Sequence, residues 1–291
     1  MPGQEFTHDY EIHYYDCDAR KRLSVLAMLR FFEDIALRQS EAVGVGLDFY
    51  EREQVAWLLS RWDIRIHALP AYMADVRVLT QPMHMRRFLA NRRYAMYDLG
   101  ERTRPAAPSS PETPAPASPD PPASMQSASH GQASSGADIP VIEADSQWVF
   151  LDTVRKRPAR IPEDVYLRYG RITESDQLPT PPPPRAPERT DAERGFSVRM
   201  SDIDSNGHVN NIRYVEWALE TLPVELLRKG TLRRLLVHYR REVRYGADVR
   251  SVAALGEEDG TAVGRHEIRS GDVVVCQLES FWDQQPSSLS P

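Results

Sequence analysis

Four polar residues alternate along the segment SDIDSNGHVNNIRYVEWALE, which runs from residue 201 to residue 220. Asp202, Asp204, Asn206 and His208 bring together two carboxylates, an amide and an imidazole, just before a helical pattern begins. In a strand these side chains would share one face, because side chains repeat with a period of two. Such a group, placed where a strand gives way to a helix, could stabilise negative charge that develops on an oxygen during a reaction.

The neighbouring residues predict a turn followed by a helix start. Gly207 permits a tight turn, and Asn210 or Asn211 can cap the helix. Free backbone N–H groups and the positive end of the helix dipole meet at such a place. The alternative is a polar capped turn with no chemistry, which Asx residues form in many proteins.

The segment has a second version earlier in the chain. Residues 15–34, YDCDARKRLSVLAMLRFFED, align with residues 201–220 at an offset of 186, and YMADVR (72–77) aligns with YGADVR (245–250) at an offset of 173. Two matches in the same order predict an internal duplication. The first version keeps Asp16 and Asp18 but has Arg20 and Arg22 in place of the amide and the imidazole.

Each half shows the same order of elements. A short strand (residues 9–16 or 195–202) precedes one amphipathic helix, which runs toward Val43 in the first half and stops near Pro223 in the second. Several strand patterns follow each helix. One helix followed by four or five antiparallel strands predicts an α+β unit whose sheet wraps around the helix.

Composition limits the class of protein. The 291 residues are 41% hydrophobic and 27% charged, with a net charge of −6, so neither nucleic acid nor a membrane surface is an expected partner. The start has no signal-peptide pattern, and no apolar run is long enough to span a membrane, so we expect a cytoplasmic protein. Cys17 and Cys276 form no metal-binding spacing and are expected to be reduced. No metal or cofactor is expected.

Two segments depart from globular composition. Nine of the 23 prolines fall between residues 101 and 140, which predicts a disordered insertion at about 103–143 inside a hairpin loop. Four consecutive prolines predict an extended linker at 179–191. The predicted organisation is an N-terminal unit (1–178), the linker, a C-terminal unit (192–284) and a tail (285–291).

The second half resembles the acyl-acyl carrier protein (acyl-ACP) thioesterase family of plant plastids and bacteria. That family has a D-x-D-x-N-x-H-V-N-N-x-x-Y-x-x-W-x-x-E core, and this chain supplies, in register, Asp202, Asp204, Asn206, His208, Val209, Asn210, Asn211, Tyr214, Trp217 and Glu220. A family Y-R-R-E element matches HYRREV, which contains Glu242. The first half also fits through YEIHYYDCD and AWLLSRWDIRI. The resemblance covers roughly residues 8–100, 144–178 and 192–284.

The resemblance implies a tandem (double) hotdog fold and hydrolysis of fatty acyl-ACP, which ends chain elongation in fatty acid synthesis. It places the catalytic residues at Asp204, Asn206, His208 and Glu242. It also suggests substrate-binding roles for Trp57 and Asn210, although Trp57 could equally be ordinary core packing. Many members have Cys after the Glu, whereas this chain has Val243, which cannot attack a thioester. The implied mechanism is therefore attack by water, for which Glu242 and His208 would form the general-base pair.

The expected partner is the acidic acyl carrier protein, which a basic surface would bind. Three clusters are candidates: Arg86, Arg87, Arg92 and Arg93; Arg155, Lys156, Arg157 and Arg160; and Arg228, Lys229, Arg233 and Arg234. The alternatives are an acyl-CoA thioesterase, a non-catalytic acyl-thioester-binding protein and, less compatible with the motif, a hydratase-type hotdog enzyme. The oligomeric state stays open between a monomeric pseudo-dimer and a homodimer.

Overall fold

The computed structural model describes residues 3–101, 139–170, 172 and 180–283. Its first half contains these elements in chain order: β1 (Phe6–Glu11), the 3-10 helix η1 (Tyr14–Asp16), α1 (Val25–Ala42), α2 (Leu47–Glu53), β2 (Val55–Ile66), β3 (Ala74–Arg86), β4 (Leu89–Glu101), β5 (Ile142–Asp152), β6 (Arg157–Pro158) and α3 (Glu163–Arg168). The second half contains β7 (Ala192–Ser197), η2 (Met200–Asp202), α4 (Asn211–Leu219), α5 (Val224–Lys229), β8 (Thr231–Tyr239), β9 (Asp248–Glu258), β10 (Thr261–Ser270) and β11 (Val273–Asp283).

Ten of the strands form one path through a single antiparallel sheet. Their order is β1-β3-β4-β5-β2-β8-β11-β10-β9-β7, with β6 paired to β5 off this path. The order reads the same from both edges, because each strand of the first half has its counterpart at the mirrored position in the second. The topology therefore repeats between the halves, as the repeated sequence predicts. Strands β2 and β8 pair at the centre and join the halves.

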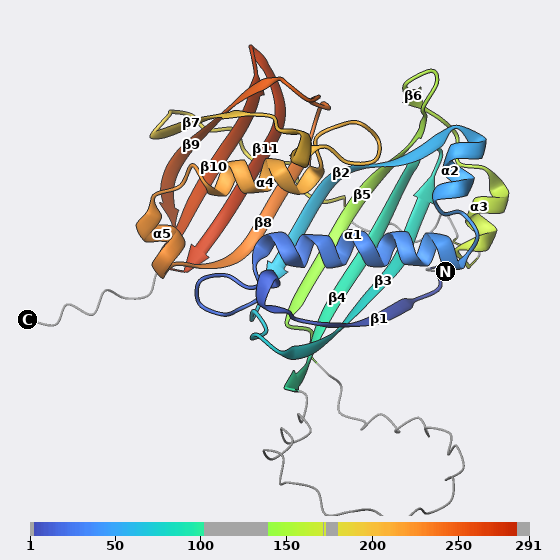
Figure 1. Ribbon diagram of the computed structural model, residues 1–291, viewed down its shortest axis with the longest axis horizontal. Coiled ribbons are helices and arrows are strands. Elements are labelled where there is room, and N and C mark those ends of the chain that lie inside the picture. Colours follow the sequence, from blue (N-terminus) through green and yellow to red (C-terminus); the bar gives the residue numbers. More distant parts are fainter. Residues whose placement is uncertain (1–2, 102–138, 171, 173–179, 284–291) are drawn as a thin grey trace, which may run out of the picture.

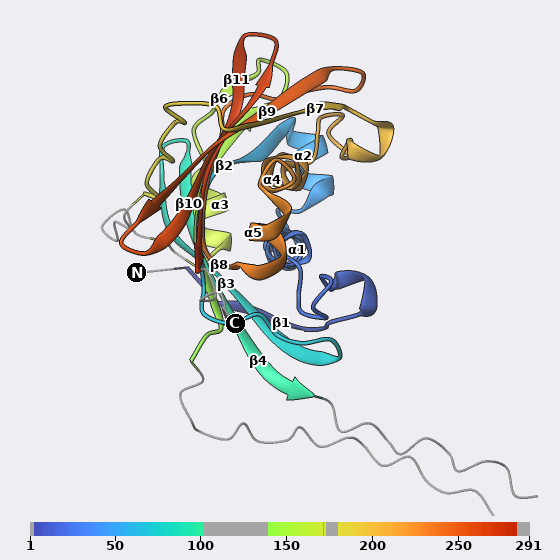
Figure 2. The same cartoon turned by 90° about the vertical axis from the view of Figure 1, so that its left-hand side faces the viewer.

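The long helices α1 and α4 pack on the same face of the sheet (Figures 1 and 2). Apolar residues of α1 at helical spacing are buried, among them Leu29, Phe32 and Ala36, and Ile212 and Val215 play the same part in α4. Ser24 caps α1 by accepting a hydrogen bond from the Ala27 N–H, a contact worth about 1 kcal/mol. One hydrophobic core runs under both helices. No helix of the described chain has the length and apolar character that crossing a membrane requires.

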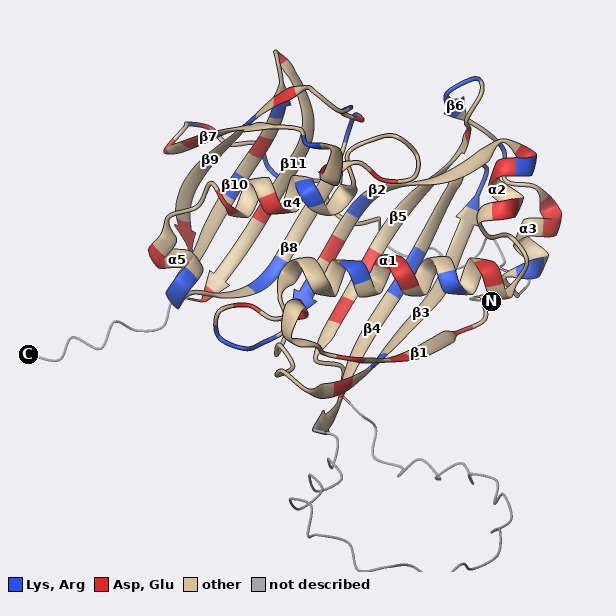
Figure 3. Cartoon of the chain, viewed as in Figure 1, with Lys and Arg blue, Asp and Glu red and all other residues tan. Residues whose placement is uncertain are grey.

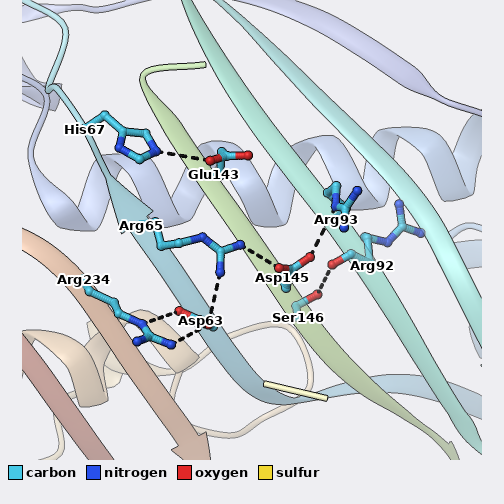
Figure 4. A network of polar contacts seen from close by, with 9 residues as sticks. All are labelled: Asp63, Arg65, His67, Arg92, Arg93, Glu143, Asp145, Ser146 and Arg234. Atoms are coloured by element: carbon cyan, nitrogen blue, oxygen red, sulfur yellow. Dashed lines mark hydrogen bonds and ion pairs between the residues drawn. The ribbon is translucent and has the colours of Figure 1, made fainter. Parts of the chain in front are cut away.

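A charged network joins the halves on the other face of the sheet (Figure 4). Arg234 of β8 donates two hydrogen bonds of 2.9 Å to Asp63 of β2. Arg65 contacts Asp63 at 3.3 Å and Asp145 of β5 at 2.7 Å. Because Trp62 and Ile64 face the core, the odd-numbered residues beside them face away from α1. The two halves are thus fixed in register by hydrogen bonds, core packing and ion pairs.

The described part of the predicted linker, residues 180–191, crosses this same outer face and has no regular structure. Arg61 of β2 donates to the Pro181 carbonyl at 3.2 Å, and Arg185 contacts Glu279 of β11 at 2.7 Å and Glu258 at 2.8 Å. The linker is therefore bonded to both halves along its length. The predicted tail at 285–291 lies outside the described residues.

Several predicted boundaries change. The predicted insertion at about 103–143 lies outside the described residues as far as 138, but its end was placed too late, because β5 begins at Ile142. The first strand of each half ends earlier than predicted, at Glu11 and Ser197, and a 3-10 turn follows each. Short elements α2, α3, β6 and α5 lie outside the predicted pattern.

Candidate active site

The polar stretch before α4 forms a compact turn and not the strand that its alternation could have formed. The η2 turn ends at Asp202, and Ile203 and Val209 then form an isolated bridge around the turn. The Asp204 N–H donates to the His208 carbonyl at 2.9 Å, and Gly207 has a φ of 77°, where glycine is favoured. The side chains therefore do not share one strand face.

Asp204 organises this turn from within. Its Oδ1 accepts the backbone N–H of Asn206 at 2.8 Å and of His208 at 3.3 Å. Its Oδ2 lies 3.5 Å from Nδ2 of Asn206. This pattern is an Asx turn, in which a carboxylate replaces a backbone acceptor. Asp204 therefore fixes the positions of both neighbouring site residues.

His208 and Glu242 form the central contact of the candidate site. The imidazole Nε2 lies 3.0 Å from Oε2 of Glu242, and the two side chains are 23% and 42% exposed. The Val209 N–H donates to the Val243 carbonyl at 2.9 Å, one residue beyond each partner. The Tyr214 hydroxyl accepts the Val243 N–H at 3.1 Å. These backbone bonds bring the two segments together, and Glu242 lies beyond the end of β8, not within the strand.

The remaining polar residues of the motif support the fold. Asp202 is buried, accepts the Arg199 N–H at 2.8 Å and contacts Arg213 of α4 at 3.3 Å. Asn210 is the N-cap of α4, and its Oδ1 accepts the Ile212 N–H at 2.9 Å. Tyr214 and Trp217 are buried in the core. The substrate-binding role of Asn210 stays a prediction, and the structure gives its side-chain oxygen a capping contact.

Trp57 lies on β2, apart from the His208–Glu242 pair. Its ring packs edge-on against Phe150 at 4.8 Å between centroids, beside the smaller hydrophobic cluster of the first half. The β2–β5 register shifts between Leu59 and Arg61, and this bulge turns Trp57 toward the same face as Trp62. Trp57 therefore faces the helix side of the sheet, and its role in binding substrate stays a prediction.

One acidic residue near the site was missed by the sequence analysis. Glu33 of α1 has a buried Oε1 with no hydrogen-bond partner within the described residues. Burial, and to a lesser degree the Asp204 carboxylate, raises the pKa of Glu33 to about 8. At neutral pH this carboxyl therefore carries its proton. The repeat offset of 186 aligns Glu33 with Leu219, so an acid at an apolar helix position was the available signal.

The other nucleophilic and metal-binding possibilities are limited by burial and geometry. Burial raises the pKa of the Cys276 thiol well above its usual range, and burial also raises the pKa of Cys17. Both shifts favour the protonated thiol over the nucleophilic thiolate. Within residues 3–101, 139–170, 172 and 180–283, no group of three or more His, Cys, Asp and Glu side chains is arranged as a metal site.

Two family descriptions match this chain. Residues 3–105 match the acyl-ACP thioesterase N-terminal domain, and residues 185–284 match the acyl-ACP thioesterase C-terminal domain. A curated relative, the chloroplastic acyl-acyl carrier protein hydrolase FATB3 of Cuphea viscosissima, is 21% identical over 281 residues. The alignment covers 92% of this chain and 59% of that relative, so the chain spans less than two thirds of the relative's length.

Solved structures share the fold over nearly the whole chain. A structure assigned as an oleoyl thioesterase of Lactobacillus plantarum has a TM-score of 0.80 at 22% identity and covers 98% of both chains. The 12:0-ACP thioesterase of Umbellularia californica has a TM-score of 0.71 at 18% identity and covers 97% of this chain and 94% of that one. The large antiparallel sheet with few helices is a hotdog-type α+β fold. With both of its characteristic domains matched in order, the chain belongs to the acyl-ACP thioesterase family.

Proposed function

We propose that this protein hydrolyses the thioester of fatty acyl-ACP to a free fatty acid and ACP, ending chain elongation in fatty acid synthesis. The observation that carries the proposal is the 3.0 Å contact between His208 and Glu242, held beside Asn206 by the Asp204 turn. Family membership supplies the reaction class, and the named relatives act on acyl-ACP. The mirrored strand order supports a finer assignment of the fold as two fused hotdog units.

The proposed reaction begins at His208. If Nε2–H donates to Glu242, the other ring nitrogen, Nδ1, is free to take a proton from water. The resulting hydroxide attacks the thioester carbonyl carbon, and the C–O bond forms as the carbonyl oxygen becomes negative. Glu242 stabilises the imidazolium that has formed. These roles resemble those of a general base and the carboxylate that orients it.

Asn206 is the proposed donor to the developing oxyanion. Its Nδ2 is only weakly engaged by Asp204, at 3.5 Å, so it can donate to a substrate oxygen. The start of α4 offers fewer free donors to the oxyanion than its helix dipole suggests. The N–H groups of Ile212 and Arg213 already donate to oxygens of Asn210. When the C–S bond breaks, the imidazolium returns its proton to the departing sulfur. The products are a carboxylic acid and the thiol of the carrier.

The mechanism we propose needs no cysteine nucleophile. Val243 occupies the position after Glu242, its side chain is buried, and its backbone joins the two site segments. The raised pKa of the buried Cys276 thiol supports the same conclusion. Water is then the nucleophile in a single displacement through a tetrahedral intermediate.

The test is release of free fatty acid from a panel of acyl-ACPs and matched acyl-CoAs by the wild type and by Glu242→Ala. We expect release from acyl-ACP that falls by about 10²-fold or more in the variant. Better release from acyl-CoA would shift the assignment to an acyl-CoA thioesterase. Absence of release from both carriers would favour a binding protein. The predicted cytoplasmic location stays a prediction.

A further inference from the structure

The structure divides the three basic clusters of the sequence into paired and unpaired groups. Arg92 is buried and bonded to Gln39 and Thr80, and Arg93 contacts Asp145. In the third cluster, Lys229, Arg233 and Arg234 each contact an acid. In contrast, the exposed side chains with no hydrogen bond or ion pair within the described residues include Arg86, Arg87, Lys156, Arg157 and Arg160.

These five cations come together at one place. Arg86 and Arg87 lie at the β3–β4 turn, and the others lie in and after the β5–β6 hairpin, whose tip carries basic residues (Figure 3). The Ile161 N–H donates to the Arg87 carbonyl at 2.7 Å, and the Phe150 N–H donates to the Phe88 carbonyl at 2.8 Å. The two turns are therefore held side by side. Two apolar side chains lie among the cations, Phe88 at 37% and Val154 at 63% exposure.

The acids that line the pocket beside these turns are already paired with other arginines. Glu53, Asp152 and Asp164 line a 660 Å³ pocket beside the turns. Arg52 contacts Glu53 at 2.9 Å, Arg155 contacts Asp152 at 3.1 Å, and Arg168 contacts Asp164 at 3.5 Å. The unpaired cations are consequently a local surplus on a chain whose net charge is −6.

Two of the five cations stand at turn positions with a positive φ. Arg87 has a φ of 55° and Lys156 a φ of 50°, values at which glycine or asparagine would be less strained. Both turns thus carry a long cation where turn geometry alone favours a smaller residue. The combination of surplus cations and exposed apolar groups matches a surface for an acidic protein helix with apolar residues.

The location also suits delivery of a substrate to the candidate site. Val55 of β2 pairs with Asp152 beside the β5–β6 hairpin, whereas Arg61 of β2 pairs with His238 near the end of β8. Glu242 follows soon after that end. These two points on β2 are six residues apart, or about 20 Å at 3.3 Å per residue. A carrier bound at the hairpin would therefore lie at the same end of the sheet as the His208–Glu242 pair.

We propose that the β3–β4 turn and the β5–β6 hairpin form the docking surface for acyl carrier protein, through Arg86, Arg87, Phe88, Val154, Lys156, Arg157 and Arg160. The proposal rests on the proposed function, since it names where the carrier of that substrate binds. The carrier's acidic helix contacts the cations, and its flexible prosthetic arm extends along β2 toward His208. Trp57 lies on β2 between the two places.

The test compares two charge-reversing double variants of the full chain. Arg157→Glu/Arg160→Glu changes the docking surface, and Arg228→Glu/Lys229→Glu makes the same charge change on α5 of the other half. Binding of purified holo-ACP is measured by titration at low and high salt. KM is measured with acyl-ACP and with the carrier-free acyl-pantetheine thioester.

We expect the docking variant to weaken holo-ACP binding and raise the acyl-ACP KM by tenfold or more, with hydrolysis of acyl-pantetheine unchanged. The α5 variant should match the wild type, and wild-type binding should weaken with salt. The proposal is overturned if the docking variant binds holo-ACP normally, or if both double variants lose binding equally. Carrier binding that depends on Arg157 and Arg160 without hydrolysis of any thioester would support the docking surface and reject the proposed function.

Discussion

The two halves of the chain build the same turn before their long helices, but the turns differ in the side chains that could carry out chemistry. Asp18 accepts the N–H groups of Arg20 and Arg22 at 2.8 and 3.0 Å, as Asp204 does for Asn206 and His208. In each half a buried Asp, at 16 or 202, accepts a backbone N–H three residues earlier. The backbone conformation of this turn therefore forms without the amide and the imidazole that occupy the second half.

The segment that is hydrogen-bonded to each turn also keeps its backbone contact but differs in its side chain. The Leu23 N–H donates to the Pro70 carbonyl at 2.8 Å, which matches the Val209–Val243 bond at 2.9 Å. With the offset of 173, Leu69 takes the place of Glu242. In the first half Arg22 donates to the Leu69 carbonyl, whereas in the second half an imidazole meets a carboxylate. The same backbone arrangement thus holds a side-chain-to-backbone contact in the first half and the proposed proton-transfer pair in the second.

The largest expected effect comes from removing the imidazole. His208→Ala should lower kcat/KM for acyl-ACP by about 10³-fold, because a general base contributes roughly that much. Its counterpart Arg22→Ala removes a side chain from the first turn and should change kcat/KM by no more than about threefold. Steady-state hydrolysis of both variants measures the difference. Equal losses would show that the two turns do not differ in function.

The next effect separates turn stability from activity. Asp18→Ala and Asp204→Ala each remove two hydrogen bonds to a carboxylate, so each should lower the free energy of unfolding by about 1–2 kcal/mol. Only Asp204→Ala should also reduce kcat/KM, by about 10²-fold, because it releases His208 and Asn206 from position. Urea unfolding and hydrolysis assays test both statements. Full activity in Asp204→Ala would contradict the positioning role.

Glu33 gives a smaller, pH-dependent effect. Its pKa is raised to about 8, so between about pH 5 and that value the folded protein keeps a proton that the unfolded chain releases. Raising the pH through this range therefore favours unfolding, by up to about 1.4 kcal/mol per pH unit. Glu33→Gln should remove this pH dependence, so the variant should become more stable relative to the wild type as the pH rises toward 8. Asp34→Asn, at a side chain that is 42% exposed, is the control in urea unfolding at several pH values.

The smallest expected effect is that of restoring a thiol beside Glu242. Val243→Cys should change kcat/KM by no more than about twofold, since the backbone bonds remain and the loss of one buried methyl group costs about 1 kcal/mol of stability. Pre-steady-state hydrolysis should show no burst of released thiol. A burst, or sensitivity to thiol alkylation that the wild type lacks, would show that this position can host a nucleophile.

Much of the fold followed from local patterns. The order of elements in each half, a short strand, a long helix and then several strands, was predicted, because alternating or continuous apolar runs mark these elements clearly. The conformation before α4 was ambiguous from the sequence. Polar residues at every second position are typical of a strand, but here Asp204 bonds the backbone N–H two residues later and forms a turn. Glu33 was not predicted, because its environment depends on packing between α1 and residues about 170 positions away. The path of the linker across the outer face was not predicted either, because it depends on a tertiary ion pair between Arg185 and Glu279.

The shared sheet has a consequence for dilute solutions. The β2–β8 pairing and the Arg234–Asp63 contact would form an intermolecular interface if the halves were separate chains. Such an interface dissociates when protomers become scarce, whereas a covalent connection keeps the local concentration of the second half high at any dilution. The region around Glu33 and the Asp204–His208 turn, which draws on both halves, therefore stays assembled in a single molecule. Its assembly is then independent of how much of this protein a cell makes.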